Sequence, residues 1–211
     1  MHLKILAAAM AIACVVLSAL PASMRSETFQ GREAYVLEND KIRVSLIRGG
    51  GHIGEIRFLS DDPRKAINPM YIPLKAGYMG QLLCFPWFGP PSPDEARQGL
   101  RFHGEAGGVE WKQSQPPKVD DRGVSFSYSA DLEKTQYRVE RTVTLLTGES
   151  VVYVEEWIEN LAAFDRPFNR NQHPTFGAPF VEPGKNVLDL PGTKGFIDPR
   201  RAAGDTLPAG R

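Results

Sequence analysis

Apolar and polar residues alternate along most of this chain, and this alternation restricts its fold more than any other feature. Residues 42–47 read Ile-Arg-Val-Ser-Leu-Ile, and residues 124–129 read Val-Ser-Phe-Ser-Tyr-Ser. Successive side chains of a β-strand point to opposite faces of a sheet, so a period of two is typical of half-buried strands. No segment beyond residue 30 has a convincing helical period. The sequence therefore predicts an all-β fold with mostly antiparallel strands.

Two short connections indicate hairpins. Asn39-Asp40 lies between the candidate strands 35–38 and 41–47. Residues 147–150, Thr-Gly-Glu-Ser, lie between two longer candidate strands, 137–146 and 151–158. Turn residues between two alternating segments are typical of antiparallel neighbours.

Two long segments interrupt the alternation. Residues 61–101 and 159–186 are rich in proline but also carry many aromatic residues. Disordered segments are poor in aromatics, so we expect two ordered loops at one end of a sheet. The alternation ends before residues 192–211, which we interpret as an irregular tail or as the start of a continuation of a larger fold.

The charge balance bears on the class of partner. The chain has 25 basic and 25 acidic residues, and its formal net charge is zero. Nucleic-acid binding depends on clustered Lys and Arg, so this balance argues against such a partner. With 42% hydrophobic residues, the 211-residue chain can bury a core, and its length predicts one main domain over residues 24–191.

Residues 1–23 have the pattern of a secretory signal peptide. Lys4 precedes an apolar run from Ile5 to Leu20, and small residues follow it. The run is shorter than the ~20 residues that a membrane span needs. We therefore expect an exported protein, periplasmic or secreted, without stable membrane insertion after cleavage. An uncleaved anchor and a lipidated Cys14 are the alternatives.

Cleavage would leave Cys84 as the only cysteine. A single cysteine cannot form an internal disulfide, so the exported domain would depend on its core for stability. Cys84 lies within Leu-Leu-Cys-Phe-Pro, residues 82–86, where we expect a packed and unreactive thiol.

His103 and His173 are the candidate acid–base residues. Each precedes Gly or Pro and lies outside the predicted strands. Histidine exchanges protons near neutral pH because its usual pKa is about 6.5. Together with Glu105 the two could instead form a metal site of two histidines and one carboxylate, although they lie far apart in sequence.

An aromatic group suggests carbohydrate binding. Phe85, Trp87 and Phe88 follow one another closely, and Trp111 lies further along the chain. Sugar faces stack on aromatic rings while polar groups bind the hydroxyls. These rings could equally cover the edge of a sheet.

The order of several motifs resembles the aldose 1-epimerase (galactose mutarotase)-like family. The motifs are Phe-Pro-Trp-Phe-Gly-Pro at 85–90, His-Gly-Glu at 103–105 and His-Pro-Thr-Phe-Gly at 173–177. The first two are most similar to the hexose-6-phosphate mutarotase branch. Residues 37–40, the glycine turn 49–53 and the strand end 155–160 are also similar. The resemblance covers roughly residues 33–182.

This resemblance implies a β-supersandwich that binds a small sugar and exchanges its anomers by opening the ring. In the family, the histidine matching His173 is the general acid, and the one matching His103 hydrogen-bonds the sugar. The reaction requires an acid at the ring oxygen and a base at the anomeric hydroxyl. The resemblance implies no metal and no cofactor.

The chain also departs from the family pattern. The family's base is a glutamate late in a longer chain, whereas no glutamate follows Glu182 here. We therefore expect a fold that is incomplete at the C-terminus. The family's sugar-binding arginine usually precedes the segment that matches 85–90, and here residues 78–81 read Tyr-Met-Gly-Gln. Gln81 could hydrogen-bond a hydroxyl, but it cannot clamp a phosphate.

Four residues are the candidate sugar ligands. Arg101 is a possible substitute for the missing arginine, as is Arg97. We expect the sugar to contact Gln81, Trp87, Arg101 and Glu105. The alternative function is a carbohydrate-binding domain that lacks the base, and the sequence indicates neither the particular sugar nor the oligomeric state.

Overall fold

The computed structural model describes residues 22–73, 75 and 77–189. The chain divides into two compact units, one ending at Val181 and the other beginning at Glu182. In the described part of the second unit, the Lys185 amide donates to the Glu182 carbonyl at 3.0 Å. The predicted signal segment and tail lie almost entirely outside the described residues, so both stay predictions. The first described strand begins at Ser23, the last residue of the predicted signal segment.

The first unit consists of two antiparallel sheets. The first sheet has the order β1-β2-β3-β4-β5-β11. Its strands are β1 (Ser23–Phe29), β2 (Arg32–Glu38), β3 (Ile42–Ile47), β4 (Ile53–Phe58), β5 (Gln81–Cys84) and β11 (Asn171–Pro174).

The second sheet has the order β10-β9-β8-β6, and β7 also pairs with β8. Its strands are β6 (Lys112–Gln113), β7 (Lys118–Asp120), β8 (Gly123–Leu132), β9 (Tyr137–Leu146) and β10 (Tyr153–Asn160). The predicted all-β, mostly antiparallel fold is confirmed.

Helices contribute little to the described part of the chain. They are α1 (Pro93–Arg97) and the 3-10 turn η1 (Ala106–Gly108). A capping box between Ser92 and Glu95 begins α1, and its brevity explains why no helical period marks it. None of the helices in these residues is long and apolar enough to cross a membrane.

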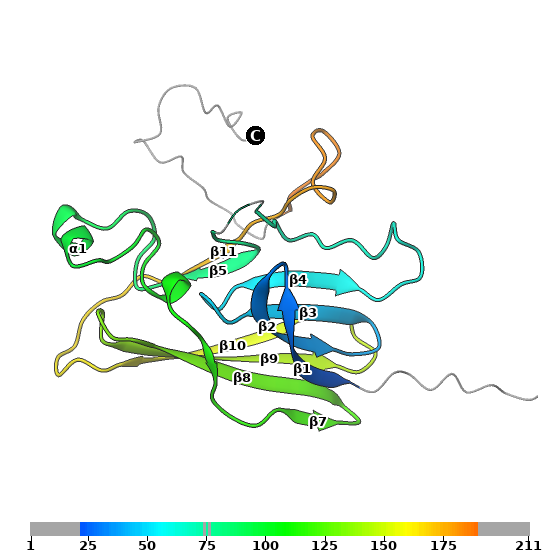
Figure 1. Ribbon diagram of the computed structural model, residues 1–211, viewed down its shortest axis with the longest axis horizontal. Coiled ribbons are helices and arrows are strands. Elements are labelled where there is room, and N and C mark those ends of the chain that lie inside the picture. The colour runs from blue at the N-terminus through cyan, green and yellow to red at the C-terminus, as the bar shows by residue number, and fades with distance from the viewer. Residues whose placement is uncertain (1–21, 74, 76, 190–211) are drawn as a thin grey trace, which may run out of the picture. The chain divides into compact units, whose positions relative to one another are not determined.

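The main core lies between the two sheets, which form two layers in Figure 1. Strands β2 and β3 contribute Leu37, Val44 and Leu46, and the facing strands β8 and β9 contribute Phe126 and Val139. Alternation places these side chains on the inner faces, which is the pattern that the sequence predicted.

The outer face of the first sheet is also partly covered. Val36 and Ile47 point away from the main core and pack with Met79 in a second small cluster. Burial on both faces explains why the alternation is less clean in this sheet than in β8 and β9.

Two strands lie within the segments predicted to be loops, and this part of the prediction is wrong. β5 lies within 61–101 and β11 within 159–186, so His173 is on a strand rather than in a loop. β5 lacks alternation because Leu82, Leu83 and Cys84 are all buried. β11 has only four residues and ends in a proline, which is tolerated because it lies at the edge of the sheet.

Candidate functional site

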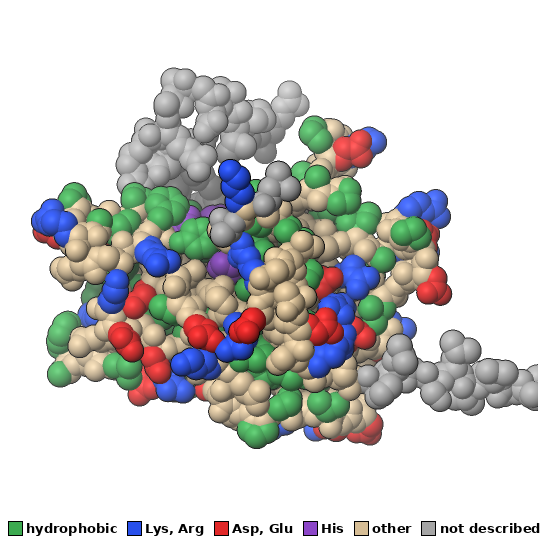
Figure 2. All heavy atoms as spheres, in the orientation of Figure 1, with side chains coloured by type: hydrophobic (Ala, Val, Ile, Leu, Met, Phe, Trp, Pro, Cys, Tyr) green, Lys and Arg blue, Asp and Glu red, His purple; other side chains and the backbone are tan. Residues whose placement is uncertain are grey.

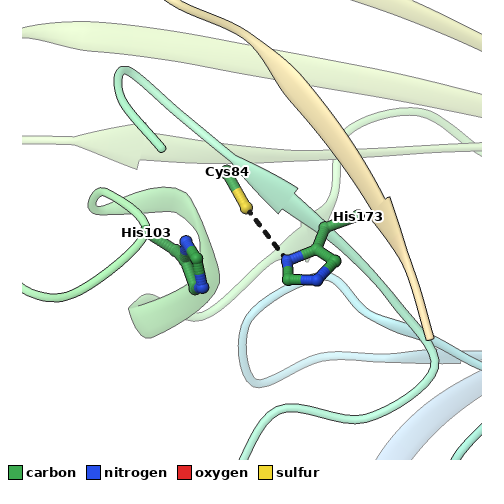
Figure 3. A group of neighbouring side chains, drawn as sticks. All are labelled: Cys84, His103 and His173. Carbon is green, nitrogen blue, oxygen red and sulfur yellow. Dashed lines mark hydrogen bonds between the residues drawn. The ribbon is translucent and has the colours of Figure 1, made fainter. Parts of the chain in front are cut away.

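Pairing of β5 with β11 brings Cys84 and His173 together. In their antiparallel register, Asn171 lies opposite Cys84 and His173 lies opposite Leu82. Cys84 and His173 are therefore diagonal neighbours on one face. The Cys84 Sγ lies 3.7 Å from the His173 Nδ1, and Figure 3 shows the two side chains pointing toward each other.

His103 reaches the same place from a tight turn. Its backbone has φ of 67°, in the left-handed region, and Gly104 follows with φ of 84°. A Cβ on Gly104 would lie 2.1 Å from the Phe85 carbonyl oxygen, so this close approach requires glycine. The turn is held against the end of β5, which points the His103 ring toward His173, with ring centroids 5.1 Å apart.

A reciprocal pair of hydrogen bonds fixes the protonation pattern of His103. The Gly89 amide donates to the His103 Nδ1 at 3.1 Å, and the His103 amide donates to the Gly89 carbonyl at 2.8 Å. A nitrogen that accepts from an N–H carries no proton, so the neutral ring has its proton on Nε2. Burial, and secondarily the neighbouring His173, lower the pKa of His103. His103 therefore presents a neutral Nε2–H donor.

His173 is the less constrained histidine. It is half-buried, and among the described residues its only hydrogen-bonding neighbour is the Cys84 thiol. Burial raises the pKa of Cys84 to about 11, so this group stays a thiol at neutral pH. This environment agrees with the predicted unreactive thiol. The histidine beside it, His173, is far away in the sequence but lies on the neighbouring strand. The Nε2 of His173 is free to exchange a proton with a bound molecule.

Aromatic rings surround the two histidines. Phe88 lies 4.8 Å from His103 and 5.6 Å from His173 between ring centroids, and Phe102 lies 4.0 Å from His103. Phe88 and Phe102 are both about half exposed. Figure 2 shows histidine side chains at the surface among apolar ones. We call Cys84, His103, His173, Phe88 and Phe102 the histidine face.

Glu105 does not join the histidines. Its carboxylate accepts hydrogen bonds from the Lys134 amide at 3.1 Å and from the Thr135 amide and hydroxyl at 2.9 and 2.7 Å. The alternative metal site of His103, Glu105 and His173 is therefore not assembled, because the connection between β8 and β9 occupies the carboxylate. A sugar contact of Glu105 stays a prediction.

Cys84 takes the third place beside the histidines instead. One potential ligand atom from each of Cys84, His103 and His173 lies within 4.8 Å of the others. A metal on His103 would need a lone pair at Nε2, where the bond from Gly89 places a proton, or would have to displace the Gly89 amide. The hydrogen bonding thus favours a donor over a metal ligand.

The other expected sugar ligands are not among the residues that form the histidine face. Trp87 is half-buried, and its Nε1 has no hydrogen-bond partner among the described residues. Gln81 lies on the same face of β5 as Leu83, which is opposite Gln172 in the strand pairing. The Gln81 amide contacts Gln172 rather than a histidine. Their contact with sugar stays a prediction.

Arg101 is exposed at a neighbouring pocket of about 360 Å³. The pocket is also lined by Arg32, His52 and Tyr78, and the Tyr78 ring lies 5.7 Å from His52 and 5.9 Å from His103. Burial, reinforced by Arg32 and Arg141, lowers the pKa of His52 to about 4.

Sequence reasoning missed a buried ionic cluster between the sheets. Arg141 on β9 and Glu156 on β10 form an ion pair whose side chains are 0% and 1% exposed. A signal was present, because Arg141 occupies an inward position in the alternation of β9, between Val139 and Val143. A charged residue at such a position predicts a buried partner.

The chain matches no protein-family model and no curated protein. Two solved structures are similar to parts of it. One is YeaD from Salmonella typhimurium, named as a candidate mutarotase: identity is 20%, the TM-score is 0.45, and the match covers 58% of this chain and 43% of that chain. The other is HI1317, with 16% identity and a TM-score of 0.40, covering 61% and 46%. The match thus spans less than half of either neighbour.

Proposed function

We propose that this protein is an aldose 1-epimerase-like protein that binds a sugar at the histidine face and exchanges its anomers. The observation that carries the proposal is the pairing of one histidine locked as a neutral donor with a second whose Nε2 is free, in an aromatic setting. The motifs at 85–90, 103–105 and 173–177 support the same assignment, since they supply Phe88, His103 and His173.

The proposed roles follow from the two hydrogen-bonding patterns. Protonated His173 donates from Nε2 to the ring oxygen, the bond between this oxygen and the anomeric carbon breaks, and the anomeric hydroxyl loses its proton to a base. The resulting aldehyde rotates, and the reverse transfers close the ring on its other face. His103 donates from Nε2 to a sugar oxygen and orients the ring.

The base is the incomplete part of this mechanism. Among the described residues, no carboxylate joins the group formed by Cys84 and the two histidines. Water can accept the anomeric proton, which permits exchange at a lower rate than a positioned carboxylate would give.

The proposal is tested by measuring anomer exchange on α-glucose and α-galactose by NMR, with the wild type and His173→Ala. We expect the wild type to equilibrate at least one sugar faster than buffer and His173→Ala to remove the gain. His103→Gln, which keeps a donor, should retain more of the rate than His103→Ala. Arg64→Gln, an exposed residue paired with Asp62, is the matched control and should behave as wild type.

Two outcomes would contradict the proposal. Exchange no faster than in buffer for every aldose tested would reject catalysis, even if sugar binding were seen. A wild-type rate in His173→Ala would reject this residue as the acid.

A further inference from the structure

The edge strand that carries His173 is attached to the opposite sheet through one carboxylate. Glu156 Oε2 accepts hydrogen bonds from Arg170 Nε at 2.7 Å and from Gln172 Nε2 at 2.7 Å. Arg170 directly precedes β11, and Gln172 lies within it, next to His173. Besides the pairing of β11 with β5 and the contacts of its side chains with that strand and the histidine face, these two bonds connect β11 to the second sheet.

The other oxygen of Glu156 anchors the cluster in the second sheet. Arg141 Nε donates to Glu156 Oε1 at 2.8 Å. Arg141 is itself held by the Gly51 carbonyl at 2.6 Å and the Tyr128 hydroxyl at 3.0 Å, and its guanidinium lies 5.0 Å from the Trp111 ring. The Glu156 carboxylate therefore connects β11 to a rigid, fully buried support.

Alternation separates this support from the histidine face. Gln172 points toward Glu156, so the neighbouring His173 points to the opposite face of β11, toward Cys84. Glu156 does not contact the His173 ring, and it acts on that ring only through the position of the strand. Gln172 also contacts Gln81 on β5, which links both strands of the pair to the cluster.

The charge state of Glu156 suits this task. Burial alone would raise the pKa of Glu156, but the charge of Arg141 and the hydrogen bonds from Gln172, Arg141 and Arg170 outweigh it and lower the pKa. The carboxylate thus stays ionised at neutral pH and holds both arginines by charge-assisted bonds.

We propose that Glu156 is a positioning residue that sets the distance and orientation of His173 relative to His103. This inference rests on the proposed function for its kinetic consequence, but the geometry can be measured without a substrate. A displacement of about 1 Å in an acid–base group can cost a hundredfold in rate.

The test uses Glu156→Gln, with Glu156→Asp as the conservative variant and Glu159→Gln as the matched control. Glu159 lies on the same strand and is exposed, and it is not a member of the cluster of Arg141, Glu156, Arg170 and Gln172. In Glu156→Gln we expect His173 ring resonances to shift and kcat for anomer exchange to fall about tenfold to a hundredfold, with KM little changed. Glu156→Asp should recover part of kcat, and Glu159→Gln should match the wild type.

A second variant guards against loss of the fold. Arg170→Gln removes only the half-exposed partner and leaves the Arg141–Glu156 pair in place. It should shift the His173 resonances in the same direction with a smaller effect. Unchanged His173 resonances and kcat in folded Glu156→Gln and Arg170→Gln would overturn the inference.

The two proposals fail differently. If the wild type exchanges no sugar but the His173 resonances move in both variants, the proposed function fails and the positioning role stands. If exchange is present and insensitive to Glu156 and Arg170, only the positioning role fails.

Discussion

The two faces of the β5–β11 strand pair contrast sharply. On one face, Gln172 joins Glu156 and Arg141 in a cluster whose charged groups are hydrogen-bonded and almost fully buried. On the other, His173 is half-buried, and among the described residues its ring has one weak hydrogen-bonding neighbour, the Cys84 thiol. Both faces are formed by the same two four-residue strands, β5 and β11. One face therefore anchors the strands, and the other presents His173 to a ligand.

The Glu156 side of the strand pair thus supports the structure, and the His173 side is available for chemistry. A buried ion pair is costly to break, which makes it a firm anchor for a short edge strand. A histidine with few internal partners keeps its proton available to a ligand. The largest effects on stability are therefore expected at buried polar groups, and the smallest at the histidine face.

Removing the buried arginine should destabilise the protein most. Arg141→Leu leaves the Glu156 carboxylate buried without its main partner, and breaking such a pair typically costs about 3–5 kcal/mol. Urea unfolding followed by tryptophan fluorescence measures the free energy of unfolding. Arg64→Leu, at an exposed pair, should leave the unfolding midpoint unchanged, and an equal loss in both variants would contradict a supporting role for Arg141.

Protonation of His52 at low pH should lower the free energy of unfolding. Its folded pKa is about 4 and its unfolded pKa about 6.5, so the unfolded chain binds more protons between these values. The stability from neutral His52 is present above pH 6.5 and declines as the pH falls toward 4, by about 3 kcal/mol. His52→Phe cannot bind a proton and should flatten this part of the profile. A profile as steep as the wild type would contradict the assignment.

The turn that carries His103 should tolerate no side chain at Gly104. Gly104→Ala places a Cβ against the Phe85 backbone, so we expect about 1–3 kcal/mol more destabilisation than in Gly148→Ala. Gly148 also has a positive φ, but nothing lies within 4 Å of its Cβ position. Both glycines have a similar positive φ, so the difference between the melting temperatures of the two variants measures the clash with Phe85 alone. Equal melting temperatures would show that the turn can move to avoid the clash.

The thiol beside His173 should matter least. Cys84→Ala removes the weak contacts with His173 and Asn171, so we expect about 1 kcal/mol of destabilisation and a fall in exchange rate of less than tenfold. Unfolding and anomer-exchange measurements on the same sample check both values. Complete loss of exchange in a folded variant would mean that Cys84 takes part in the chemistry rather than in packing.

The sequence was most informative where one face of a strand meets water. The alternation in β8 and β9 and the turns at Asn39-Asp40 and 147–150 predicted two hairpins that the structure contains. β5 was missed because its residues are buried on both faces and so do not alternate. β11 was missed because it is four residues long and depends on β5 for its hydrogen bonds.

The sequence predicted the two histidines of the candidate site but not the third residue beside them. His103 and His173 lie together, as expected, because the turn at Gly104 and the β5–β11 pairing converge. Glu105 was expected beside them because it is two residues from His103, yet the reversal at Gly104 directs it to Thr135. Cys84 is 89 residues from His173, so only the strand register shows their contact.

The most direct measurement is ¹⁵N NMR of the histidine rings across a pH titration, which reports the tautomer and the titration of each imidazole. The account predicts that His103 is neutral at pH 7, carries its proton on Nε2 and titrates below pH 6.5, and that the His173 resonances shift when a sugar is bound. A proton on Nδ1 of neutral His103, or titration of His103 above pH 6.5, would contradict the claim that this face combines a fixed donor with a free acid.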